Sequence, residues 1–180
     1  KTVVEGYAAW LALPWRDSLS AAERVVMLVY PPAQERRIRA RLPELDLRTT
    51  ESGRTWREVD ISNDLGRWIA GHEYAAEFFA DPSEMTDGIL EDFERELVER
   101  LRATLADAGT EEVVCLIGVG SLFPFVRTSF LISALESAVI GRLLVLFPGH
   151  HDSERHTFRL LDARDGFNYR ARVISVDKDS

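Results

Sequence analysis

The sequence predicts a single α/β domain whose mostly parallel central sheet, of about five strands, is flanked by helices. Two apolar runs, residues 113–119 and 142–147, have the composition of strands that are buried on both faces. Helical patterns separate the strand-like runs, which is typical of parallel sheets with right-handed crossovers. A length of 180 residues suits one domain, so we expect residues 1–180 to form it, with residues 1–20 as a peripheral segment.

The first half of the chain alternates between helical and strand-like patterns. Prolines follow several of these patterns, and proline interrupts both helices and strand ladders. In chain order the sequence predicts a short helix over residues 7–13, a buried strand over 24–30, an arginine-rich helix over 33–45, a half-buried strand over 55–61, a helix from a cap at Ser62 to Ala70, and a short helix over 73–79.

The second half contains the clearest helical pattern. Apolar residues recur three or four positions apart from Leu90 to Leu105, which predicts a helix from about Asp87 to Asp107. After it the sequence predicts a strand over residues 113–119, an apolar helix over 125–139, a strand over 142–147, and one or two short strands between 156 and 176.

The single cysteine, Cys115, lies inside an apolar strand-like run. It has no partner for an intramolecular disulfide, which fits a reducing cytoplasm. Burial in apolar surroundings raises the pKa of a thiol, so we expect a packing role and no nucleophilic one. No apolar run reaches the roughly 20 residues of a membrane-spanning helix. We therefore expect a cytoplasmic protein without membrane contact.

The net charge of −8 is concentrated in residues 81–112, which hold eleven acidic residues and three arginines. The favoured interpretation is a solvated helix face. The other interpretation is a docking surface for a basic partner. Direct binding of nucleic acid needs a basic face, so we expect none, apart from the open case of a small basic patch near the C-terminal arginines.

A glycine-rich turn follows the first of the two apolar runs, with the sequence GVGSLFPFVR over residues 118–127. A nucleotide-binding loop needs G-x-x-x-x-G-K-[ST], and no lysine follows here. The dinucleotide pattern G-x-G-x-x-G fails as well, because Phe123 holds the third glycine position. We therefore expect no nucleotide cofactor. The glycines Gly118 and Gly120 predict a tight strand-to-helix turn, in which Pro124 opens the helix.

Residues 150–156 (HHDSERH) hold three of the four histidines and two carboxylates. These are metal-ligand types, but the spacing matches neither H-E-x-x-H nor H-x-x-E-H. A polar surface loop after a Pro148-Gly149 turn explains the same composition, so we expect no metal site. Ser121 has no identifiable base, and the sequence contains no catalytic constellation.

Four arginines, Arg127, Arg164, Arg170 and Arg172, lie near the predicted turns or the last strands. Two interpretations are equally favoured: ion pairs that tie the last strands to the sheet, or an interface rich in arginine and aromatic residues.

The runs GVGSLFPFVRTSFLISALE, GRLLVLFPG and FRLLDARDGFNYRARVI resemble the BrxB family of bacterial phage-exclusion (BREX) systems. The N-terminal half is similar in outline: VVMLVYPPAQERRIRARLPEL resembles the family's strand, proline turn and E-x-x-x-R helix, and WREVDIS resembles its second strand. The similarity extends from about Arg24 to Ile174.

This resemblance implies an α/β fold of P-loop-like topology without a working nucleotide loop. It also implies a non-enzymatic assembly subunit that docks on the PglZ-like component and works with other BREX proteins; no catalytic residue carries over. The alternative is a nucleotide- or metal-dependent enzyme that uses the Gly118–Arg127 turn and the His150–His156 loop. The candidate interaction residues are Gly118, Gly120, Ser121, Phe123, Pro124, Arg127, Pro148, Gly149, Asn168, Tyr169 and Arg170.

Overall fold

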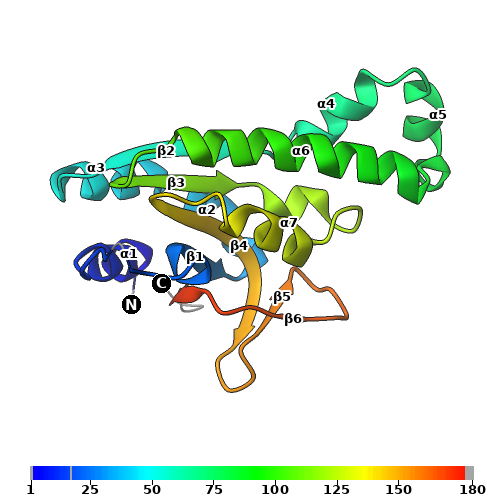
Figure 1. The fold of residues 1–180 in the computed structure, drawn as a ribbon. Helices are drawn as coiled ribbons and strands as arrows, with labels where there is room; N and C mark the ends of the chain where they lie inside the picture. Colours follow the sequence, from blue (N-terminus) through cyan, green and yellow to red (C-terminus); the bar gives the residue numbers. More distant parts are fainter. Residues whose placement is uncertain (1, 17, 177–180) are drawn as a thin grey trace.

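The computed structural model describes residues 2–16 and 18–176 and contains a central sheet of five parallel strands (Figure 1). The strand order is β2-β3-β4-β1-β7, and each neighbouring pair runs parallel. The strands are β1 (Val25–Tyr30), β2 (Thr55–Asp60), β3 (Glu112–Ile117), β4 (Arg142–Asp152) and β7 (Arg172–Ser175). The predicted α/β class with a mostly parallel sheet of about five strands is confirmed.

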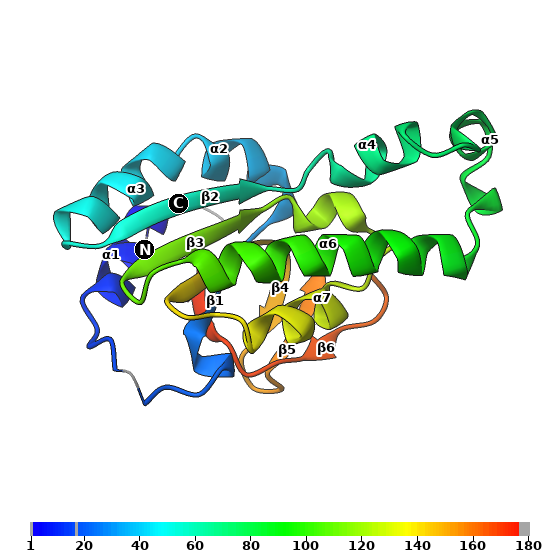
Figure 2. The ribbon, with the colours of Figure 1, turned by 45° about the horizontal axis from the view of Figure 1, so that its top comes forward.

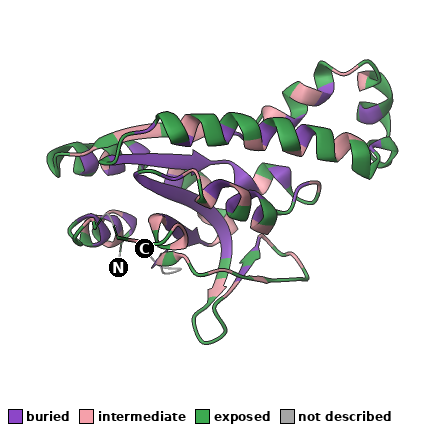
Figure 3. Cartoon of the chain, viewed as in Figure 1, coloured by how far each residue is buried: buried purple, intermediate pink, exposed green. Residues whose placement is uncertain are grey.

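Helices cover both faces of this sheet (Figure 2). Because successive strand side chains point to opposite faces, β1 sends Val26 and Leu28 into one core and Met27 into the other. One core contains α1 (Val3–Leu11), α2 (Glu35–Arg39) and α3 (Leu42–Glu51), and the other contains α6 (Asp87–Asp107) and α7 (Thr128–Glu136). The three central strands are buried almost throughout (Figure 3).

The arginine-rich segment after β1 forms two helices, so the prediction of one helix over residues 33–45 is wrong. A short 3-10 helix (η2, Pro32–Gln34) leads into α2, and α3 begins at Leu42. Pro43 is the physical reason: it has no N–H to donate to the carbonyl of Arg39, so a single helix cannot run through this position. Proline is tolerated in the first turn of α3, because the backbone N–H groups of a helix's first turn have no partner within the helix.

The C-terminal part forms a hairpin that leaves the main sheet. Residues Leu143–Pro148 of β4 pair with β1, and Gly149–Asp152 then pair antiparallel with β5 (Thr157–Leu160), which pairs with β6 (Phe167–Asn168). The predicted Pro148-Gly149 turn is therefore wrong, because both residues lie inside one long strand. A Cβ at position 149 would lie 2.1 Å from the carbonyl oxygen of Arg159, so glycine permits the close approach of β5.

A helical arm, residues 64–94, extends beyond the carboxyl ends of β2 and β3 (Figures 1 and 2). It consists of α4 (Asp64–Ala70), α5 (Ala75–Ala80), the 3-10 helix η3 (Pro82–Glu84) and the first two turns of α6. Its interior is an aromatic cluster in which the ring centroid of His72 lies 5.4 Å from that of Trp68 and 5.0 Å from that of Phe78. The predicted Ser62 cap of α4 is wrong, since Asn63 holds the N-cap position without a side-chain bond.

The long helix α6 has the predicted bounds and buries the predicted stripe of apolar residues, Phe93, Leu97, Leu101 and Leu105. None of the helices formed by residues 2–16 and 18–176 is both long and apolar enough to cross a membrane.

Candidate functional site

The carboxyl ends of the central strands surround a small cavity of about 270 Å³, here called the switch-point cavity. The chain leaves β1 toward α2 on one face of the sheet and leaves β3 toward α7 on the other. In open α/β sheets, ligands usually bind in the crevice between two strands whose following helices lie on opposite faces of the sheet. The lining residues are Pro32, Glu35, Arg39, Ser62, Gly118, Gly120, Ser121, Pro148 and Leu161.

The glycine-rich turn forms one wall of this cavity, and its tight strand-to-helix geometry is confirmed. Gly118 has a φ of +95°, and a Cβ there would lie 2.4 Å from the Oγ of Ser62. The chain continues directly into a 3-10 helix, η4 (Val119–Leu122), and Ser121 donates its hydroxyl to the carbonyl of Gly118 at 2.7 Å. Gly120 serves packing, because a Cβ there would lie 3.2 Å from the Cγ of Pro148.

The start of α7 differs from the prediction, which had Pro124 opening the helix. The carbonyl of Leu122 accepts the N–H of Phe125 at 2.7 Å and that of Val126 at 2.9 Å. This turn holds residues 122–126 out of the helix, and α7 begins only at Thr128. Pro124 follows a cis peptide bond with Phe123, outside the helix.

An ion-pair network crosses the switch-point cavity from the β1 exit to the β2 exit. Arg39 donates to Glu35 at 2.7 Å, to Asp60 at 3.0 Å and to the hydroxyl of Ser62 at 2.7 Å. The hydroxyl of Tyr30 donates to Glu35 at 2.6 Å, and the backbone N–H of Ser62 donates to Asp60 at 2.9 Å. One guanidinium thus joins two strand exits that lie far apart in the sequence.

Asp60 and Tyr30, two members of this network, have pKa values that are shifted in opposite directions. Burial alone would raise the pKa of Asp60, but the hydrogen bonds from Ser62 and the charge of Arg39 outweigh it and hold this pKa below its ordinary value. Burial, followed by the hydrogen bond that it donates to Glu35, raises the pKa of Tyr30 well above its ordinary range. Asp60 is therefore ionised and Tyr30 is protonated at neutral pH.

We expect the Asp60→Asn variant to unfold with a weaker dependence on pH under acid conditions. The pKa of Asp60 is lower in the folded state, so its contribution to stability is present above the unfolded value of 3.8 and is lost as the pH falls through the folded value. The side chain is about half exposed, so solvent screening limits the effect to about 1 kcal/mol or less. Urea unfolding at pH values from about 5 to 2 measures the slope. If the unfolding free energies of the wild type and of Asp60→Asn depend equally on pH, the lowered pKa assigned to Asp60 is wrong.

A second hollow, here called the α7 groove, lies between the start of α7 and the loop from β5 to β6. Its volume is about 550 Å³, and it brings the predicted residues Phe123, Pro124 and Arg127 together with Arg164. The two arginines are exposed, and neither side chain has a hydrogen-bond or carboxylate partner among residues 2–16 and 18–176.

The remaining predicted residues do not join either hollow. Asn168 accepts a hydrogen bond from Thr157 in the small hairpin sheet, and Tyr169 donates its hydroxyl to Glu136 of α7. Arg170 and Arg172 lie at the amino-terminal end of β7, at the opposite edge of the sheet, in a hollow that includes Trp10 and Trp15. Arg170 therefore lies apart from Arg127, because β7 runs parallel to the other strands of the sheet and Arg170 precedes it.

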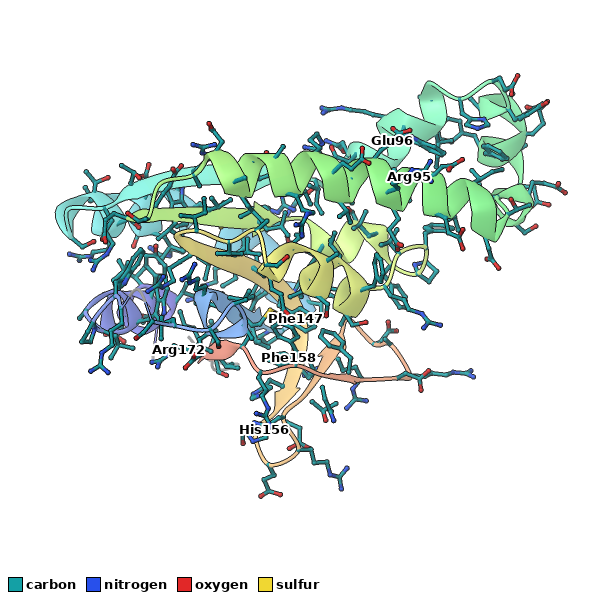
Figure 4. All side chains as sticks on the ribbon, viewed as in Figure 1. Arg95, Glu96, Phe147, His156, Phe158 and Arg172 are labelled. Carbon is teal, nitrogen blue, oxygen red and sulfur yellow. The ribbon has the colours of Figure 1, made fainter. Side chains whose placement is uncertain are left out.

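The predicted loop over residues 150–156 is wrong in part, because residues 150–152 belong to β4 and pair with β5. Only residues 153–156 form the turn of the β4–β5 hairpin, and His156 is the last of them (Figure 4). His151 packs against Phe158 with its ring tilted by 34° and the ring centroids 4.5 Å apart, and partial burial lowers the pKa of His151. In the part of the chain that the structure describes, no three histidine, cysteine or carboxylate side chains gather at metal-binding distance. Cys115 is fully buried in β3, where burial raises the pKa of its thiol.

The acidic segment, residues 81–112, divides into two parts. Toward its C-terminal end the carboxylates have partners: Arg57 pairs with Asp107 at 3.0 Å and with Glu112 at 2.6 Å. Around the helical arm several exposed carboxylates have no hydrogen-bond or cationic partner among the described residues. They are Glu73, Glu77, Glu84, Asp87 and Glu91.

Sequence reasoning assigned no site role to the residues of the Arg39 network. Glu35, Arg39 and Ser62 line the switch-point cavity, and Asp60 bonds to Arg39 and Ser62 beside it. The signal was present as the E-x-x-x-R spacing, because residues four apart share one helix face. Asp60 and Ser62 flank the end of the predicted second strand, where parallel sheets collect polar residues.

A family model described as BREX protein BrxB matches residues 73–174, which is more than half of the chain. The matched region begins at the tip of the helical arm and includes the glycine-rich turn, the α7 groove and the hairpin. No curated protein and no solved structure matches the chain.

Proposed function

Because the chain belongs to the BrxB family of BREX anti-phage defence proteins, we propose that it is a non-enzymatic interaction subunit that docks on the PglZ-like component. The observation that carries this proposal is the helical arm, which extends beyond the carboxyl ends of the strands (Figure 1). The arm exposes large hydrophobic side chains. These exposed side chains of the arm are not part of the buried core, so a partner can contact them without unfolding the chain.

Two aromatic residues on the arm support a docking role. Phe79 is 60% exposed and Tyr74 is 52% exposed, while the neighbouring Phe78 is buried in the aromatic cluster. Phe78 and the cluster hold α5 on α4, so the backbone that carries Phe79 is fixed before any partner binds. Aromatic residues are enriched at interface centres, where they contribute most of the binding free energy.

The charge of the arm indicates the chemistry of the partner surface. The exposed carboxylates without partners lie on the same helical arm as Tyr74 and Phe79, so the arm combines acidic side chains with two exposed aromatic ones. A basic patch on the partner gives the complementary potential and accelerates association at low ionic strength. Of the acidic segment, residues 81–112, only the part that belongs to the helical arm is included in this docking proposal.

We also infer a P-loop-like arrangement around β1, which lies between β4 and β7 in the parallel sheet. In P-loop proteins a strand leads through a G-x-x-x-x-G-K-[ST] loop into a helix. The corresponding turn here is Pro31-Pro32-Ala33-Gln34, and the helix opens with Glu35, whose carboxylate would repel a phosphate. This sequence favours an interaction role over nucleotide hydrolysis.

The enzyme alternative requires the glycine-rich turn and the histidine loop to act together. The turn lines the switch-point cavity. His150 instead pairs with Arg159 in the β4–β5 hairpin, and His156 lies in the turn of that hairpin (Figure 4). We therefore expect a His150→Ala/His156→Asn variant to protect host cells from phage as well as the wild type, because both residues lie outside the arm. Asparagine tolerates the positive φ of 52° at position 156. A plaque assay measures this, and loss of protection with a normally folded variant would favour the enzyme alternative.

Capture of the tagged chain from its native host tests the docking proposal. The expected result is recovery of the PglZ-like protein, weakened as the salt concentration rises because the arm is acidic. A capture that lacks the PglZ-like protein at low salt would count against the proposal.

A further inference from the structure

The α7 groove contains features that the docking role of the arm does not use. One wall consists of residues Phe123–Ser129, which lead into α7, and the other consists of residues of β5 and the following loop. Its volume of about 550 Å³ is in the range of small-ligand sites. The groove and the helical arm are built from different elements, so the two surfaces can be tested independently.

The start of α7 forms one side of the groove and has an unusual charge arrangement. The N-terminus of a helix carries partial positive charge and N–H groups without helical partners. Most helices place an acidic residue or a capping side chain there, but α7 has no acidic residue in its first turn and no side-chain cap. Arg127 holds the N-cap position and adds a full positive charge to the same point.

A second arginine faces the same hollow. Arg164 lines the groove from the opposite wall, and neither arginine has a hydrogen-bond or carboxylate partner within residues 2–16 and 18–176. The only carboxylate that lines the groove among these residues is Asp165. Two arginines and a helix N-terminus therefore line one groove, which a single carboxylate also lines.

Thr128 supplies an independent observation. The residue is only 5% exposed and lines the groove, and its Oγ1 is buried without a hydrogen-bond partner among the described residues. Buried polar atoms are nearly always paired, so an unpaired hydroxyl at the first position of α7 indicates a partner that comes from outside the chain. A hydroxyl donates well to an anionic oxygen.

We propose that the α7 groove binds a phosphate group at the N-terminus of α7. Arg127 and Arg164 hold the phosphate oxygens from two sides, and the first N–H groups of α7 and the hydroxyl of Thr128 donate to them. Asp165 opposes the anion and limits its affinity. The phosphate group belongs either to free phosphate or to a nucleoside monophosphate, for which Phe123, 38% exposed, offers a stacking surface.

NMR titration of the full isotope-labelled chain with inorganic phosphate and, separately, with AMP tests the proposal. We expect saturable shifts at the start of α7, a loss of affinity of about tenfold or more in Arg127→Gln and in Arg164→Gln, and a gain in Asp165→Asn. Thr128→Val, which keeps the side-chain volume, is expected to lower affinity about fivefold. The matched control is Arg36→Gln, which removes an exposed arginine of α2 and leaves binding unchanged.

Comparison of the two ligands identifies the source of the phosphate. If Phe123→Ala weakens the binding of AMP and leaves the binding of inorganic phosphate unaffected, the ligand is a nucleotide. If AMP and inorganic phosphate bind with equal affinity to the wild-type chain and to the Phe123→Ala variant, the groove recognises the phosphate group alone. Absence of saturable shifts with both ligands at millimolar concentration overturns the proposal. So does an Arg127→Gln variant that binds both ligands as tightly as Arg36→Gln does.

Discussion

Replacement of Gly118 by alanine is expected to destabilise the fold by about 3 kcal/mol, which corresponds to a fall in Tm of roughly 10 °C for a chain of this size. The φ of +95° disfavours any residue with a Cβ, and the new Cβ would lie 2.4 Å from the Oγ and 2.7 Å from the backbone N of Ser62. Ser62 cannot retreat without breaking its bonds to Asp60 and Arg39. Urea denaturation measures the change.

Gly66 provides the matched control for this substitution. It lies within α4, and a Cβ there would meet no atom within 4 Å. The Gly66→Ala variant is therefore expected to gain about 0.5–1 kcal/mol from the higher helix propensity of alanine. Equal free energies of unfolding for the two variants would contradict the close contact between the glycine-rich turn and Ser62.

Removal of the two exposed aromatic side chains of the arm is expected to abolish docking while leaving the fold intact. Truncation of an interface-centre aromatic residue costs about 2 kcal/mol or more of binding free energy, so the Tyr74→Ala/Phe79→Ala variant should bind its partner at least about a thousandfold more weakly if the two contributions add. Both side chains are more than half exposed in the free chain, so unfolding free energy should change by less than about 1 kcal/mol.

The matched control for the arm is Leu47→Ala on α3. Leu47 is 56% exposed, so its truncation removes a similar amount of exposed apolar surface at a position outside the arm. Phage protection should be lost in the arm variant and retained in the control. Equal protection by both variants would move the docking surface away from the arm.

The sequence was sufficient to predict the main elements that depend on hydrophobic periodicity. The stripe from Leu90 to Leu105, the fully apolar β1 and the apolar run of β3 after Glu112 were predicted because their hydrophobic patterns are properties of each segment by itself. The missing lysine after Gly118 also follows from the sequence alone. The tight turn at that glycine was predicted correctly, because a left-handed backbone there favours a residue without a side chain.

The errors arose where tertiary contacts decide the local structure. Pro148 and Gly149 predict a turn by composition. In the structure Pro148 is the last residue of β4 that pairs with β1, and Gly149 permits the close approach of β5. The network of Arg39 joins two strand exits that only the sheet order brings together. The separation of Arg170 from Arg127 likewise depends on strand direction, which periodicity does not specify.

The most direct test of the docking role is the affinity between the purified chain and the purified PglZ-like protein, measured at low salt. We expect the wild-type chain and the Leu47→Ala control to form a complex with a dissociation constant in the micromolar range or below, and the Tyr74→Ala/Phe79→Ala variant to form none. If the wild-type chain and the PglZ-like protein elute separately at micromolar concentration, the proposal that this chain is a docking subunit for that component is wrong.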